Sequence, residues 1–232
     1  LIKGLLTTIA NKPFQILIMI TLLFIMGTQV VEQLQRFLSL YYVYDGKEDS
    51  SALLAGLGST IWIVTSVGCV PIYTYVSARI GKRKTFMFSI FMLGVASMSK
   101  LVLFNPEYPW LMLLQGLLYG PAYSGIWLMI PAISADIVDD DELGTGERRE
   151  GSYASVFSNI IKLSFAVGAY AAGLIVTVSG FEESAKAVQD PTVYPTMMML
   201  AAYIPAIACL GAWLLLRKFP ISPESAAETR RI

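Results

Sequence analysis

Histidine is absent from the 232-residue sequence, and charged residues make up only 15% of it. The lack of histidine excludes Ser/His and Cys/His nucleophilic pairs, imidazole general bases and His-ligated metal sites. Only two cysteines occur, Cys69 and Cys209, each within an apolar run, so the sequence offers neither a disulfide framework nor a CxxC motif. Basic and acidic residues balance at 17 each, which gives no electrostatic reason for binding nucleic acid. We therefore expect neither an enzyme nor a nucleic-acid-binding protein.

Apolar residues, by contrast, are abundant. They form 55% of the chain, against roughly 45–50% in soluble domains. A bilayer core about 30 Å thick requires about 20 mainly apolar residues per helix, and lipid offers no hydrogen-bond partners to an irregular backbone. Six segments meet this requirement, and they cover residues 14–42, 52–78, 85–104, 108–135, 152–180 and 194–216. The sequence predicts an all-α, multi-pass integral membrane protein with six transmembrane helices.

Lysine and arginine are distributed unevenly between the connections. Twelve fall on the side that carries both chain ends, whereas only Lys47 and Lys186 fall on the other side. Because cytoplasmic connections are enriched in Lys and Arg, we expect both termini in the cytoplasm and the bundle in a bacterial-type inner or plasma membrane. Residues 1–13 would be a cytoplasmic linker, 14–219 the bundle and 220–232 a cytoplasmic tail. Since residue 1 is Leu and no signal peptide follows it, we expect a fragment of a longer protein.

Three basic residues lie within the apolar segments, namely Arg36, Lys100 and Lys162. A charged side chain costs about 2.5–3.5 kcal/mol at the centre of a transmembrane helix. Lys100 is close to the outer end of its segment, so we expect its side chain to extend to the membrane interface. Glu32 and Arg36 are four residues apart and share one face of the first helix, which favours an outer polar pair. This pair has either a structural role at the outer rim or a part in admitting substrate.

Lys162 lies eleven residues beyond Gly151, or roughly 16 Å along a helix, which places it near the bilayer midplane. Ser155, Ser158, Asn159 and Lys162 follow the spacing i, i+3, i+4, i+7 and form one polar stripe. We expect this stripe to line a central cavity and to contact a substrate or a coupling ion. The alternative is a lysine that is hydrogen-bonded within helix packing.

An aromatic stripe occupies the fourth segment, where Gln115, Tyr119, Tyr123 and Trp127 repeat at i+4 around Gly120-Pro121. Sugar rings present apolar C–H faces that pack on aromatic rings, so this stripe has the chemistry of a sugar-binding wall. Aromatic residues at helical spacing also serve simply as packing. Both interpretations remain open at this point.

The connection at residues 136–151 carries seven acidic residues and two arginines, without the spacing of a calcium-binding loop. Both signs of charge together favour an ion-paired network that opens and closes a cytoplasmic gate. The residues that we assign to this gate are Asp136, Asp139, Arg148, Arg149 and Glu150.

This region also resembles a known family. Ala135-Asp-Ile-Val-Asp139, Gly146-Glu-Arg-Arg-Glu-Gly151 and the lysine 26 residues after Asp136 are similar to the second half of the glycoside-pentoside-hexuronide:cation symporters, the melibiose permease relatives within the major facilitator superfamily. The resemblance implies that the six segments are helices seven to twelve of a twelve-helix carrier. It also implies that Lys162 couples the sugar and cation sites, and that Asp136, Asp139 and Arg148 belong to the cytoplasmic closing network.

The leading hypothesis is therefore the C-terminal half of a secondary active transporter, which moves a sugar, a glycoside or a related solute together with Na⁺ or H⁺. The expected partners are membrane lipid, a small polar solute and a missing N-terminal six-helix bundle, which would hold the main ion site. No other cofactor or metal is expected. Two alternatives are a transporter of lysolipids or other amphiphiles, and a non-transporting six-helix scaffold that dimerises.

Overall fold

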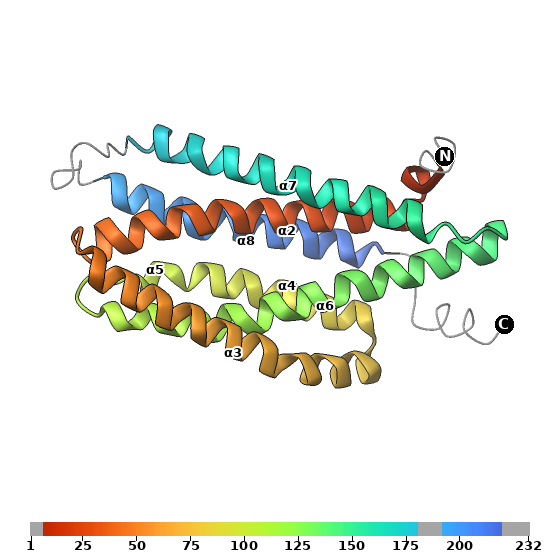
Figure 1. The fold of residues 1–232 in the computed structure, drawn as a ribbon, viewed down its shortest axis with the longest axis horizontal. Helices are drawn as coiled ribbons and strands as arrows, with labels where there is room; N and C mark the ends of the chain where they lie inside the picture. The colour runs from red at the N-terminus through yellow and green to blue at the C-terminus, as the bar shows by residue number, and fades with distance from the viewer. Residues whose placement is uncertain (1–6, 181–191, 220–232) are drawn as a thin grey trace.

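The computed structural model describes residues 7–180 and 192–219, and its regular elements there are all helices (Figure 1). Six helical stretches are long and apolar enough to cross a membrane, which confirms the expected fold class. Their elements, with the short helical segments that adjoin them, are α2 (Lys12–Phe37) with the π-helical η1 (Leu38–Val43), α3 (Glu48–Ile80), α4 (Lys82–Met98) with α5 (Lys100–Leu103), the 3-10 segment η2 (Pro109–Leu111) with α6 (Met112–Thr145), α7 (Glu150–Val178) and α8 (Val193–Arg217).

The helices run side by side, and α2 and α8 pack against each other near the middle (Figure 1). Helix α7 packs mainly against α2 along one edge, and α3 packs mainly against α6 along the other. Helix α4 contacts both α6 and α8. We call the end where α2 begins and α8 finishes the terminal end, and the end that carries the connections at residues 44–47 and 104–108 the opposite end. The two edge helices thus have few neighbours within this bundle.

Two clusters of buried apolar side chains hold the bundle together. The larger one lies toward the terminal end and includes Phe14, Phe24, Phe86 and Ile126 from three different helices. The smaller one lies toward the opposite end, around Leu34 and its neighbours on η1, α7 and α8. Helix α2 contributes to both clusters, because its apolar residues recur at helical spacing along its whole length.

Helices α3 and α6 meet through small residues and hydroxyl groups. Thr65 Oγ1 donates a hydrogen bond to the carbonyl oxygen of Gly116 at 3.2 Å, and Ser66 Oγ donates one to that of Gly120 at 3.0 Å. Small residues allow helix backbones to approach closely in membranes, where polar contacts between helices add stability. The glycines of α6 therefore position α3 at the edge of the bundle.

Several helix boundaries differ from the sequence-based expectation. The connection expected at residues 136–151 is helical up to Thr145, so only residues 146–149 separate α6 from α7. A helix satisfies its own backbone groups and needs no lipid to continue, so the acidic segment extends α6 as a solvated helix. It ends at Gly146, whose left-handed φ of 71° and N–H bond to the carbonyl of Glu142 form a C-cap. Most of the long connection expected at residues 181–193, with Lys186, lies outside the described residues.

Candidate functional site

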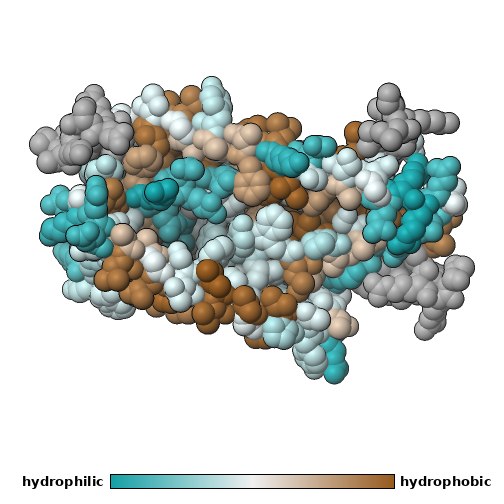
Figure 2. Space-filling view, in the orientation of Figure 1, coloured by the Kyte–Doolittle hydropathy of each residue, from teal (hydrophilic) through white to brown (hydrophobic). Residues whose placement is uncertain are grey.

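A cavity of about 460 Å³ opens between α2, η1, α3 and α6, in the half of the bundle nearer to the opposite end. In Figure 2 hydrophilic surface extends inward from that end, with apolar side chains on either side of it. The residues that line the cavity are Glu32, Gln35, Arg36, Ser39, Leu54, Ala55, Gly58, Ser59, Trp62, Met112, Gln115, Gly116 and Tyr119. The cavity therefore combines charged groups, amides and aromatic rings at the depth of the membrane-spanning helices.

Glu32 and Arg36 both line this cavity, as their shared helix face predicts. Both side chains are exposed, and among the described residues neither a hydrogen bond nor an ion pair joins the two. The structure thus places the two predicted residues at one site without a direct contact between their charges. Both residues line the cavity, which is where a guest would meet them.

Lys100 does not reach the membrane interface, and the expectation that it does so is wrong. Its side chain is 2% exposed, and its Nζ atom has no hydrogen-bond partner among the described residues. Nζ lies 5.5 Å from the centroid of the Tyr119 ring, a distance typical of a cation–π contact. The reason is that the short helix α5 packs against both α6 and α8, and Lys100 is buried within the bundle there. Sequence reasoning identified Lys100 as a basic residue within a span but missed its burial beside Tyr119.

The aromatic stripe of α6 forms a continuous column of rings. Tyr119 stacks on Tyr123 with centroids 6.0 Å apart, and Tyr123 lies 6.1 Å from Trp127. Phe24 from α2 contacts the rings of both Tyr123 and Trp127. Trp62 from α3 contacts Tyr123 at 5.5 Å. All three rings pack against the apolar core, and Tyr119 also lines the cavity. The aromatic stripe therefore contributes to helix packing and, through Tyr119, to the wall of the cavity.

The polar stripe of α7 lies on a surface of its own. Helical geometry puts Ser155, Ser158, Asn159 and Lys162 on the side opposite the residues that α7 buries, which include Ser164 and Gly168. Gly168 marks the packed side, since a Cβ there would lie 2.7 Å from the Cβ of Gln29 on α2.

All four residues of the α7 stripe are exposed, and Asn159 Nδ2 donates to the Ser155 carbonyl at 3.0 Å. Exposed apolar residues, among them Leu163, Phe165 and Tyr170, flank the stripe on both sides. The stripe is thus separate from the packed face of α7, and none of its members lines the cavity.

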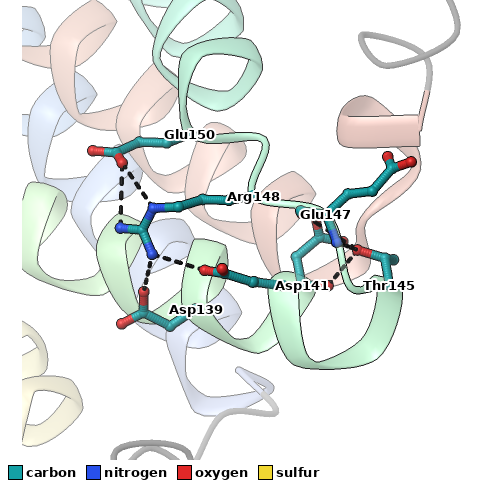
Figure 3. Close-up of polar contacts among 7 residues, drawn as sticks. Asp139, Asp141, Thr145, Glu147, Arg148 and Glu150 are labelled. Atoms are coloured by element: carbon teal, nitrogen blue, oxygen red, sulfur yellow. Dashed lines mark hydrogen bonds and ion pairs between the residues drawn. The ribbon is translucent and has the colours of Figure 1, made fainter.

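The predicted gate residues form two groups at the terminal end. Arg148 lies among carboxylates, 3.3 Å from Glu150 and 3.8 Å from Asp139 (Figure 3). The carboxylate of Glu142 is nearer still, at 2.7 Å. These acids raise the pKa of Arg148, mainly through its hydrogen bond and charge interaction with Glu142, so the guanidinium stays protonated.

Arg149 pairs with a different acidic residue from those that surround Arg148. Its Nη2 atom lies 2.9 Å from an oxygen of Asp141, and both side chains are nearly buried. Sequence reasoning missed Asp141 and Glu142 as partners because it treated their segment as a loop. On the helix, both acids are held close to the α6–α7 connection.

Asp136 belongs to the second group. Its carboxylate accepts a 2.7 Å hydrogen bond from Nζ of Lys82, which also donates to the carbonyl of Ala132 at 2.8 Å. Lys82 begins α4 directly after Gly81, so the basic connection at residues 79–84 is tied to α6. The next residue, Arg83, donates to the last carbonyls of α8, at Leu216 and Arg217. The start of α4 is therefore bonded to the interior of α6 and to the end of α8.

Within residues 7–180 and 192–219, no group of three His, Cys, Asp or Glu side chains is placed so that it could hold a metal ion. The acidic residues near the α6–α7 connection instead face the two arginines. The carboxylates are thus paired with arginines of the same chain, an arrangement that fits an ion-paired network better than a cation-binding site.

Comparison with known proteins agrees with this architecture. A family model described as MFS/sugar transport protein matches residues 1–223, so the chain belongs to the MFS/sugar transport family. A relative from Synechocystis sp. (strain ATCC 27184 / PCC 6803 / Kazusa), named uncharacterized symporter sll1374, is 32% identical over 114 residues. That match covers 47% of this chain and 20% of the relative. The chain is thus a multi-pass membrane protein of a solute-transport family, and it corresponds to a minor part of this relative's length.

Proposed function

We propose that this bundle is one half of a cation-coupled symporter for a sugar, a glycoside or a related polar solute. The observation that carries the proposal is the exposed polar stripe of α7, which ends at Lys162 and lies on the side of the helix opposite its buried residues. A charge at this depth is expensive unless it faces a hydrated space or a partner. A companion bundle on that side would enclose such a space, and family membership supports it.

The two edge helices support the same arrangement. Helix α3 has no buried residue in its most apolar window, and α7 has few. In a twelve-helix carrier, two bundles rock against each other around a site near the midplane. Uncovered edges at α3 and α7 provide the surfaces on which a second bundle would pack. Lys162 would then contact the solute or respond to the bound cation.

The two ion-pair groups would act as the cytoplasmic gate, with the terminal end facing the cytoplasm. Lys82 with Asp136 and the arginine pair with its carboxylates already join α4, α6 and α7. Breaking and remaking such pairs is a known way to switch between two packed states. The lysolipid carrier and the dimerising scaffold remain alternatives that the following experiment separates.

The experiment measures uptake by the full-length transporter in proteoliposomes, with radiolabelled galactosides, xylosides and glucuronides as probes and imposed Na⁺ or H⁺ gradients. Lys162→Ala is compared with Lys218→Ala, which removes an exposed lysine outside the spans. We expect gradient-driven uptake to be lost in Lys162→Ala and retained in the control, with equal insertion of both. Unchanged uptake in Lys162→Ala overturns the coupling role. Lysophosphatidylcholine uptake alone would support the amphiphile carrier, and a stable homodimer without any uptake would support the scaffold.

A further inference from the structure

Helix α4 carries an exposed apolar stripe that ends in a lysine. Phe88, Phe91 and Val95 are exposed and recur at helical spacing. The residues that α4 buries, such as Phe86, lie on the opposite side of the helix. Lys84 is exposed and lies four residues before Phe88, so it continues the stripe to the terminal end. This face of α4 is therefore apolar within the span and positively charged where the span begins.

Helix α8 has the same pattern in the opposite direction. Ile207, Leu210 and Leu214 are exposed along one face, and Arg217 follows three residues after Leu214. The guanidinium carbon of Arg217 lies 5.0 Å from the centroid of the Trp213 ring, a distance typical of a cation–π contact. Since α8 ends where α4 begins, both stripes carry their cations at the terminal end.

Arg83 brings the two charged ends together. Its Nε atom donates to the carbonyl oxygen of Leu216 at 3.0 Å, and its Nη2 atom donates to that of Arg217. Lys84 is the next residue along the chain, so it lies with Arg217 at the corner where α4 packs against α8. We call Arg83, Lys84 and Arg217 the basic corner.

The two stripes lie on the same side of the contact between α4 and α8. A Cβ atom added at Gly94 would lie 3.6 Å from the Cβ of Cys209, so these two residues mark where the helices face each other. Each immediately precedes a residue of its own stripe, Val95 or Leu210, and successive residues turn about 100° around a helix. Because α4 and α8 run in opposite directions, this rotation carries both stripes to the same side.

The positive charge of the basic corner is uncompensated among the described residues. Lys82 pairs with Asp136, but no ion pair within 4.0 Å includes a residue of the basic corner. Neither α4 nor α8 contains an Asp or a Glu. An apolar surface made by two neighbouring helices thus ends in a group of cations without acidic partners.

We propose that the basic corner binds the phosphate of an anionic phospholipid, whose acyl chains lie along the exposed stripes of α4 and α8. Lys84 and Arg217 contact the phosphate, and Arg83 is a positioning residue that holds their helices together. Apolar side chains exposed at this depth are complementary to lipid tails, and long basic side chains at the end of a span reach the level of the lipid phosphates.

The charge of the basic corner selects the lipid class. A zwitterionic phospholipid carries an ammonium group beside its phosphate, and three cations without an acidic partner disfavour it. The companion bundle proposed above packs on α3 and α7, whereas this site lies on two other helices. The lipid site is therefore separate from the proposed transport function, and each can fail without the other.

The test measures lipid binding to the full-length protein by native mass spectrometry, without solute or ion gradient. Phosphatidylglycerol and phosphatidylethanolamine with the same dioleoyl chains are titrated in parallel. A basic residue near the membrane surface strengthens binding of an anionic lipid about fivefold, so two phosphate contacts predict about 25-fold tighter binding of phosphatidylglycerol. Equal affinity for the two lipids overturns the proposal. A stable dimer that binds neither lipid also overturns it, because a second copy then covers the stripes.

Free glycerol 3-phosphate distinguishes a lipid site from a site for soluble phosphates. It carries the same phosphate without acyl chains, so an excess of it should leave phosphatidylglycerol bound. Displacement of the lipid by this probe overturns the assignment to a phospholipid.

Lys84→Gln combined with Arg217→Gln removes both phosphate contacts. Lys12→Gln combined with Arg79→Gln is the matched control, which removes one lysine and one arginine from exposed positions of α2 and α3 at the same end. The first double variant should weaken phosphatidylglycerol binding about 25-fold and leave phosphatidylethanolamine binding unchanged, whereas the control should change neither. Equal effects of the two double variants overturn the proposal. If the first does not fold, Lys84→Gln alone decides, with an expected loss of about fivefold against Lys12→Gln, and no loss overturns the proposal.

Discussion

At Gly120, α6 lies so close to α3 that an added Cβ atom would be 2.7 Å from the carbonyl oxygen of Trp62 and 2.2 Å from Thr65 Oγ1. A threonine side chain is able to rotate, but a backbone carbonyl is not. In Gly120→Ala the helices must therefore separate by roughly 0.7 Å to restore an ordinary contact. Overpacking of this kind costs about 1–3 kcal/mol, and replacing a helical glycine by alanine returns about 0.5–1 kcal/mol. We expect a net loss of about 1–2 kcal/mol.

The assay is thermal unfolding of the purified protein in detergent, followed by tryptophan fluorescence. The expected loss corresponds to a decrease in Tm of about 2–6 °C. Gly173→Ala on α7 is the matched control, since an added Cβ there meets no atom within 4 Å. The control should melt at the same temperature as the unsubstituted protein or higher. If Gly120→Ala and Gly173→Ala melt together, the close approach of α3 and α6 does not constrain this position and the reasoning is refuted.

Three further predictions concern charge. Asp136→Asn should lower Tm by a few degrees because it leaves Lys82 without its carboxylate partner, whereas Asp140→Asn, at an exposed position, should not; equal melting of the two variants would contradict this. Arg149→Gln should lower Tm more than Arg148→Gln, because the Arg149–Asp141 pair is nearly buried and Arg148 is 56% exposed; the reverse order in the same assay would refute it. Burial raises the pKa of Tyr44, so the phenol ionises at lower pH in the unfolded chain than in the folded protein. Stability should therefore fall as pH rises above 10. Tyr44→Phe should lessen this fall in Tm between about pH 9 and pH 11, in comparison with Tyr108→Phe at an exposed position.

The six spans could be predicted because length and apolarity alone decide whether a segment crosses a bilayer. Their ends could not be placed as well. A helix continues into water as long as its residues allow it, and the acidic run before Gly146 contains no helix-breaking residue until Gly144. The pairing of Arg148 and Arg149 with Asp141 and Glu142 follows from that helical extension, which is why sequence reasoning found the arginines and missed two of their acids.

The cavity was only partly predictable for a different reason. Helical spacing correctly put Glu32 and Arg36 on one face, because that relation is local to α2. The environment of Lys100 depends instead on which helices lie beside α5, and depth counted along one segment contains no information about its neighbours. Gln115 and Tyr119 lie about one turn apart on α6 and form the wall next to Lys100, yet no spacing in the chain relates them to it.

Gly81, whose φ of 89° suits glycine, is the only residue between α3 and α4. A connection of one residue cannot lengthen, so an axial displacement of α3 also displaces the first turn of α4. That turn holds both Lys82, which is bonded to α6, and Arg83, which is bonded to the end of α8. A displacement of α3 at the edge of the bundle is thereby passed through the first turn of α4 to α6 and to the end of α8, with no flexible loop to absorb it.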